Sequence, residues 1–207
     1  INKNNGGTQF NGAEIKFAEF VCLGSGMNYM GGNIFNSRFI SNSGRAMLTG
    51  SATKIYDCYL ESSSSNALDM RNNSEIYNST IISDGTVCVN TVGSTATKMI
   101  GCTVKGSNSV YSVNSLSLVE DCIIVNSGTG KGIEVNATTQ IINNIITLEA
   151  GTADAIDLNT YVNSLVSGNK IFVNDPSATG IVSANVNVYI VDNKIKGTTL
   201  GVDLGSG

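Results

Sequence analysis

The sequence contains no histidine, and this absence removes several kinds of active site at once. Ser-His-Asp and Cys-His nucleophilic systems need an imidazole, and histidine is also a common metal ligand. A zinc site built on cysteine is disfavoured too, because none of the five cysteines has CxxC spacing. Carboxylates are the remaining candidates for catalytic chemistry.

Charged residues are scarce, at 14% of the chain, and 12 basic against 16 acidic residues give a net charge of −4. No basic stripe is present, which argues against nucleic acid or anionic lipid as a partner. Long apolar runs are missing as well, since none approaches the roughly 18 residues of a membrane span. The first residues also lack the apolar core of a signal peptide. We therefore expect no membrane insertion.

The chain does contain a short repeat: an apolar residue, two spacers, a small polar or Cys residue, one spacer and a second apolar residue. Eight copies follow Gly32, with their central residues 20 to 25 positions apart. A single proline and no run of like charges leave no sign of linkers, so this drifting period indicates a coiled solenoid rather than a string of domains. The central residues are Ser37, Cys58, Ser79, Cys102, Cys122, Asn144, Asn169 and Asn193.

Each repeat is too short for a helix pair, carries β-branched residues at alternating positions, and is interrupted by Gly, Asn and Ser clusters that suit turns. A second apolar strand follows the phrase, most clearly at 67–70, 132–135, 155–158 and 201–204. The pattern predicts an all-β solenoid of about eight turns. In each turn three short strands pair with the same strands of neighbouring turns, about 4.8 Å away.

Residues 1–32 fit the repeat poorly, and we expect them to form an N-terminal cap or an irregular first turn over the open edges of the solenoid at 33–207. The chain starts with Ile and ends in Gly-Ser-Gly directly after a repeat element. We therefore expect it to be a piece of a longer protein.

Residues 33–207, with repeats that read like Gly-Ile-x-Leu followed by Ile-x-x-Asn-x-Ile, resemble the right-handed parallel β-helices of the pectate-lyase-like class. Within that class they look most like bacteriophage tailspike, fibre or appendage domains. The resemblance implies that Asn144, Asn169 and Asn193 stack as an internal ladder, which the Ser and Cys residues of the earlier copies continue. A buried amide both donates and accepts along such a column, and Ser and Cys fit the same space.

The five cysteines are expected to be free thiols, because their number is odd and three of them occupy the ladder position. Cys102 and Cys122 are consecutive in the stack, but parallel side chains on neighbouring strands are poorly aimed for a disulfide. Cys88 is predicted at an outward or sheet-edge position, with a structural role.

Carboxylates recur at one place in the second apolar strand, where Asp69, Glu134, Asp157 and Asp203 should form an outward column. The same register puts Cys88, Tyr111 and Val182 in the intermediate turns, with a one-residue slip open at Tyr111. Glu134 and Asp157 lie in neighbouring turns, about 5 Å apart, which is similar to the carboxyl separation of retaining glycosidases. Solvated surface, carbohydrate or calcium binding, and catalysis by Glu134 and Asp157 are the three interpretations of this column.

Two further columns are apparent. Asp57, Asp121 and Asp192 immediately precede ladder positions, as do Asn36, Asn78 and Asn143, and such residues bond backbone N–H groups in turns. Outward Tyr56 and Tyr77 should stack beside Phe35 as an aromatic strip, which suits a subunit interface or a sugar site.

The resemblance favours a non-catalytic β-helical rod of a virion tail fibre, tailspike or surface adhesin that contributes to cell-surface glycan recognition. The ligand candidates are Asp69, Tyr111, Glu134, Asp157, Asp203, Tyr56 and Tyr77. The resemblance implies a homotrimer on a virion or extracellular surface, with a cell-surface polysaccharide as partner and no cofactor except a calcium ion left open. A polysaccharide lyase or glycoside hydrolase and a structural spacer without a ligand remain the alternatives.

Overall fold

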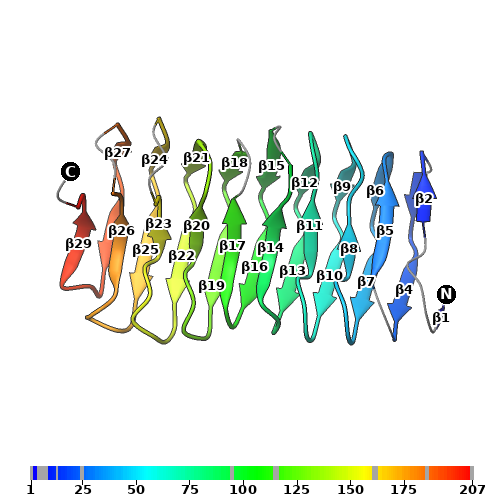
Figure 1. Cartoon of the computed structure of the whole chain (residues 1–207), viewed down its shortest axis with the longest axis horizontal. Coiled ribbons are helices and arrows are strands. Elements are labelled where there is room, and N and C mark those ends of the chain that lie inside the picture. Colours follow the sequence, from blue (N-terminus) through cyan, green and yellow to red (C-terminus); the bar gives the residue numbers. More distant parts are fainter. Residues whose placement is uncertain are drawn as a thin grey trace.

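Three parallel β-sheets, named A, B and C, run along the long axis of the molecule in the computed structural model (Figure 1). The structure describes residues 2–3, 9–12, 14–23, 26–93, 96–113, 117–159, 163–184 and 187–205. Successive turns lie side by side from β1 and β2 at the N-terminal end to β29 at the C-terminal end (Figure 1). The predicted all-β parallel solenoid is confirmed.

Each turn contributes one strand to each sheet. Sheet A contains β1 (Asn2–Lys3), β4 (Glu19–Cys22), β7 (Arg38–Ser41), β10 (Tyr59–Ser62), β13 (Thr80–Ser83), β16 (Thr103–Gly106), β19 (Ile123–Asn126), β22 (Ile145–Leu148), β25 (Lys170–Val173) and β28 (Lys194–Lys196). Sheet B contains β2 (Gln9–Asn11), β5 (Met27–Met30), β8 (Met47–Leu48), β11 (Leu68–Met70), β14 (Val87–Thr91), β17 (Ser109–Val113), β20 (Ile133–Val135), β23 (Ile156–Asp157), β26 (Thr179–Val182) and β29 (Leu200–Asp203). Sheet C contains β3 (Glu14–Lys16), β6 (Asn33–Phe35), β9 (Lys54–Tyr56), β12 (Glu75–Tyr77), β15 (Thr97–Ile100), β18 (Ser117–Glu120), β21 (Thr139–Ile142), β24 (Leu165–Ser167) and β27 (Tyr189–Val191). From β6 onward, sheet C has eight strands, which matches the eight copies of the repeat. The described residues include no helix, and therefore none able to cross a membrane.

The repeat phrase spans the end of a sheet C strand and the start of the next sheet A strand. Its first apolar residues align in sheet C, as Ile34 with Ile55 and Ile55 with Ile76, and the second align in sheet A, as Phe39 with Leu60. These side chains are buried and form one continuous hydrophobic core along the axis. Removing this apolar surface from water is the main driving force for the fold.

The corner between sheets C and A requires a left-handed backbone in every turn. Between each first apolar residue and its ladder residue lies one residue with φ between 47° and 68°. L-amino acids other than Asn, Asp and Gly rarely adopt this conformation. The Asp and Asn column stands at the corner, as predicted, and the full set of corner residues is Phe17, Asn36, Asp57, Asn78, Gly101, Asp121, Asn143, Gly168 and Asp192.

The predicted ladder follows this corner and is also confirmed. The Asn144 N–H donates to Asn169 Oδ1 at 2.8 Å, and the Asn169 N–H donates to Asn193 Oδ1 at 3.0 Å. The series continues toward the N-terminus, where the Cys122 N–H donates to Asn144 Oδ1 at 2.9 Å. Each side chain thus satisfies a buried backbone donor of the turn before it.

A second column of buried polar residues, made of serine and asparagine, lies at the corner between sheets A and B. The repeat phrase did not reveal this column. Ser41, Ser62 and Ser83 are buried in register in β7, β10 and β13, and Asn126 is buried two strands further on. The Ser62 hydroxyl donates to the Gly44 carbonyl at 2.7 Å, and Asn126 Nδ2 donates to the Asn108 carbonyl at 2.8 Å. A second polar column therefore supports the second corner.

Residues 1–32 supply β1 to β5, which pair with β4 to β8 of the same three sheets. Ile15 and Phe20 are buried in register with Ile34 and Phe39. The repeat is hard to detect here because Phe17 stands at the left-handed corner position, and because its neighbour Ala18 takes the ladder position. The Ala18 N–H donates to Ser37 Oγ at 3.1 Å, as a ladder residue should.

Candidate functional site

The outer face of sheet B carries the predicted carboxylate column. Asp157 is in register with Glu134 on one side and with Val182 on the other, and Val182 is in register with Asp203. Asp69 belongs to the same row. The expected order of the acidic residues is therefore confirmed, although two of the intermediate positions are not.

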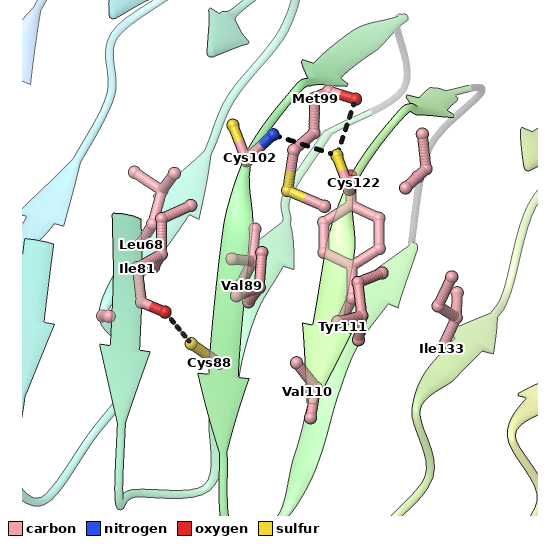
Figure 2. Close-up of a cluster of buried hydrophobic side chains, with 14 of the residues drawn as sticks. Leu68, Ile81, Cys88, Val89, Met99, Cys102, Val110, Tyr111, Cys122 and Ile133 are labelled. Atoms are coloured by element: carbon pink, nitrogen blue, oxygen red, sulfur yellow. Dashed lines mark hydrogen bonds between the residues drawn. The ribbon is translucent and has the colours of Figure 1, made fainter. Parts of the chain in front are cut away.

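Tyr111 does not lie in this outward column, and its prediction as a ligand-binding residue is wrong. It is in register with Val89 and Ile133, and its ring is 0% exposed within the cluster that contains Met99, Cys102 and Cys122 (Figure 2). The backbone position in the column belongs to Ser112. Two consecutive residues, Val110 and Tyr111, face the core, so simple alternation assigned the wrong face.

Cys88 was also placed wrongly, because it is buried rather than outward. Its thiol donates to the Lys105 carbonyl at 3.4 Å. It also lies 3.6 Å from the Ile81 carbonyl (Figure 2). Asn90 takes the column position that Cys88 was expected to fill. All five cysteines are free and buried, as predicted for the thiols, and burial raises the pKa of Cys58 to about 11 and that of Cys88 further.

Two carboxylates of the column, Asp69 and Asp157, are buried rather than solvated, so the interpretation of the column as ordinary surface does not hold for them. Lys131 lies between two members of the column, with its Nζ 2.9 Å from Glu134 Oε1 and 2.6 Å from Asp157 Oδ2. The Asp157 side chain is only 11% exposed, and its Oδ1 accepts the Asn159 N–H at 2.8 Å. Burial lowers the pKa of Lys131, but the hydrogen bonds and charges of Asp157 and Glu134 outweigh burial and leave this pKa raised.

Asp69 lies three turns before Glu134 in the column and is likewise held by a cation and a hydrogen-bond donor. Its side chain is 10% exposed and its Oδ2 pairs with Arg45 Nη1 at 2.7 Å. Asn66 Nδ2 donates to Asp69 Oδ1 at 2.7 Å. Arg45, Asn66 and Lys131 all come just before sheet B strands, and their positions opposite the acidic row were not predicted. Asp203, in the last turn, is half-buried and accepts the Gly205 N–H at 3.0 Å.

One further carboxyl, Asp154, lies beside this group and was missed. Burial and the charge of Asp157 raise the pKa of Asp154 above its ordinary value. The hydrogen bonds from Thr179 and the charge of Lys131 lower this pKa by a smaller amount. Its backbone carbonyl accepts the Gly132 N–H, which places it one turn from Lys131. No group of three or more His, Cys, Asp and Glu side chains among the described residues is arranged to hold a metal ion.

The predicted aromatic strip exists on the outer face of sheet C. Phe35 and Tyr56 stack with ring centroids 5.0 Å apart and an interplanar angle of 8°, and Tyr56 and Tyr77 stack at 5.0 Å and 6°. Lys16 Nζ lies over the Phe35 ring, 5.4 Å from its centroid, and Ile100 follows Tyr77 in the next turn. The ring faces are therefore turned toward one another, so the strip offers mainly ring edges to a partner. This geometry suits a subunit contact better than a sugar ring that stacks face to face.

Glu75 fixes the strip at its Tyr77 end. It accepts the Tyr77 hydroxyl at 2.8 Å and pairs with Lys98 at 2.9 Å and Lys54 at 3.5 Å. The hydrogen bond from Lys98 is the main reason that the pKa of Glu75 is lowered. Burial, followed by the bond to Glu75, raises the pKa of Tyr77 to about 12.

A surface groove of about 760 Å³ runs over the corner between sheets C and A in the first turns. Asn36, Asp57 and Asn78 line its floor from three successive turns, and all three are exposed. Phe17 forms one end, with its side chain 80% exposed. The groove was not predicted as a site, although its corner residues were recognised as turn residues.

Arg38 and Tyr59 form the sheet A side of this groove. Arg38 Nη1 pairs with Glu19 Oε1 at 2.8 Å, and the guanidinium lies 5.2 Å from the centroid of the Tyr59 ring. The Tyr59 hydroxyl donates to Glu61 Oε2 at 2.8 Å. These contacts orient the Arg38 and Tyr59 side chains beside the groove.

Comparison of the chain with protein-family models, curated proteins and solved structures finds no match in any of the three. The function must therefore be argued from the outer faces and the corner groove themselves.

Proposed function

We propose that this chain is a non-catalytic β-solenoid rod that recognises cell-surface glycans as part of a virion tail fibre, tailspike or surface adhesin. The observation that carries this proposal is the corner groove, which combines an exposed aromatic ring with amide and carboxylate groups on a rigid corner. Sugar rings have apolar faces and polar edges, so they fit a site of this composition.

The acidic column supports the non-catalytic part of the proposal. A glycosidase needs one carboxylic acid and one carboxylate that face the scissile bond. Here Glu134 and Asp157 both bind the same ammonium group, which fills the space between them. The column therefore serves mainly to stabilise the stacked turns.

An apolar patch on sheet A supports self-association of the rod, for which a homotrimer is the expected form. Ile123, Ile145 and Phe172 are exposed on β19, β22 and β25, which are adjacent strands. Exposed apolar residues that gather on one face of a sheet mark protein interfaces in soluble proteins. Analytical ultracentrifugation of the wild type and of Phe172→Ser tests this: we expect a trimer that the substitution weakens, and a monomeric wild type would refute it.

The second candidate function, a polysaccharide lyase or glycoside hydrolase, is favoured by Asp154. A raised carboxyl pKa beside a second carboxyl, here that of Asp157, is typical of a general acid. Its pairing with Asp157 would then provide the acid and the base or nucleophile.

A screen of the purified chain on an array of bacterial surface polysaccharides, with and without calcium, tests the proposal. Each bound glycan is then assayed for new reducing ends and for unsaturated products. Binding without cleavage is the expected result. Cleavage that disappears in Glu134→Gln, Asp157→Asn or Asp154→Asn would establish the enzyme instead, and binding to no glycan would leave the structural spacer.

A further inference from the structure

Phe17 is an exception in a column that otherwise follows one rule. Eight later turns place Asn, Asp or Gly at the left-handed corner position, and Phe17 occupies it with a φ of 50°. A bulky side chain is strongly disfavoured in this backbone region, whereas Asn and Gly adopt it readily. The fold by itself therefore favours another residue at this position.

Burial of the Phe17 ring does not compensate for this backbone strain. Its side chain is 80% exposed, while the core positions on either side of the corner, Ile15 and Phe20, are buried. An exposed aromatic ring on a strained backbone contributes little to stability. Its position at the end of the corner groove points instead to a role in contacting a ligand.

We infer that Phe17 forms a ring-stacking subsite for an uncharged saccharide chain, which lies along the corner groove parallel to the solenoid axis. This inference rests on the proposed function and identifies the part of the surface that performs it. Asn36, Asp57 and Asn78 repeat along the groove with the spacing of the turns, about 4.8 Å. A glycan that extends from Phe17 along the axis meets one hydrogen-bonding group per turn.

The charges in the groove select the class of sugar. The Arg38 guanidinium is already engaged by Glu19 and by the Tyr59 ring. Asp57 adds an exposed carboxylate to the floor of the groove. An acidic glycan would meet this carboxylate without a free cation to bind it, so the groove favours uncharged sugars.

The variant Phe17→Asn tests the inference, because it installs the residue type that the column prefers. Wild type and variant are compared on the same array of uncharged and acidic bacterial polysaccharides, and by calorimetry with an oligosaccharide from the uncharged polysaccharide that binds best. We expect the affinity to fall by about ten-fold or more, the equivalent of losing the burial of part of one aromatic ring. The melting temperature should be unchanged or higher. Phe17→Tyr, which keeps the ring, should retain binding.

Tyr189→Asn is the matched control, because Tyr189 is an exposed aromatic residue at the opposite end of the solenoid. It should bind as the wild type does. Wild-type affinity in Phe17→Asn, or a preference for acidic glycans, would overturn this inference and leave the proposed function standing. A lower melting temperature in Phe17→Asn would show that Phe17 serves the fold. A wild type that binds no glycan would refute the proposed function itself.

Discussion

Replacement of Asn169 by leucine tests the ladder most directly, because the two side chains have similar shapes and only the polar groups are lost. Asn169 is fully buried, and its Oδ1 accepts both the Asn144 N–H at 2.8 Å and Asn144 Nδ2 at 3.0 Å. Its Nδ2 donates to the Ile141 carbonyl at 2.9 Å and to Asn193 Oδ1 at 2.9 Å. The substitution therefore removes partners from groups in three successive turns.

The expected cost follows from the buried groups that lose a partner. Each such group costs about 1–3 kcal/mol, and the added apolar surface of leucine offsets part of the loss, so we expect a destabilisation of about 2–4 kcal/mol. For a chain of this size the melting temperature should fall by roughly 5–15 °C. The melting temperature of Asn169→Ser should lie between those of the wild type and Asn169→Leu, because Ser37 and Ser79 perform the same role in earlier turns.

Thermal unfolding followed by circular dichroism measures this effect, and amide hydrogen exchange at Asn144 localises it. Asn174→Leu is the matched control, since Asn174 is exposed and its side-chain amide donates one hydrogen bond, to the Glu149 carbonyl at 3.2 Å. Its effect should stay within about 0.5 kcal/mol. A melting temperature of Asn169→Leu equal to that of the wild type would refute the argument that the ladder satisfies buried backbone groups.

Three further predictions concern the corner, the acidic column and the aromatic strip. Asp121→Val should lower stability in urea denaturation by about 1–2 kcal/mol, because a β-branched residue resists a φ of 53°, whereas Asp121→Asn should be tolerated. Lys131→Met should cost roughly 1–3 kcal/mol at pH 7, since two carboxylates lose their shared cation. Because the pKa of Lys131 is raised in the folded chain, its contribution is complete below the ordinary lysine value of about 10.5, and the difference from wild type should shrink as the pH rises through the raised pKa. A difference independent of pH would show that Lys131 acts through packing alone. Ultraviolet titration should reveal a tyrosine with a pKa near 12 that moves toward the ordinary value in Glu75→Gln, because the Glu75 charge opposes ionisation of Tyr77, and an unchanged titration would contradict the assigned contact.

The repeat phrase was sufficient to predict the solenoid, its strand order and its first ladder. These features depend on local information, because alternating inward residues define the strands and the residue before each ladder position defines the corner. The substitution of Asn144, Asn169 and Asn193 by Ser or Cys in earlier copies did not hide the ladder, since all three side-chain types satisfy the same buried backbone donors.

Sequence periodicity did not assign the faces of sheet B correctly in every turn. Some sheet B strands contain two consecutive buried residues, such as Val110 and Tyr111, so a period of two residues loses its phase there. This is why Tyr111 and Cys88 were expected outside and are found in the core.

The sequence by itself determined the coil, because a repeat of 20 to 25 residues with alternating apolar positions buries its side chains only by stacking on copies of itself. Only the tertiary structure determined which polar side chains on the surface contact one another. Lys131 reaches Asp157 in the next turn, and Phe17 lies at the end of a groove built by residues up to 63 positions later in the chain, Thr80 being the last. Such neighbours are set by the lengths of the turns and the register between coils, which no local pattern encodes.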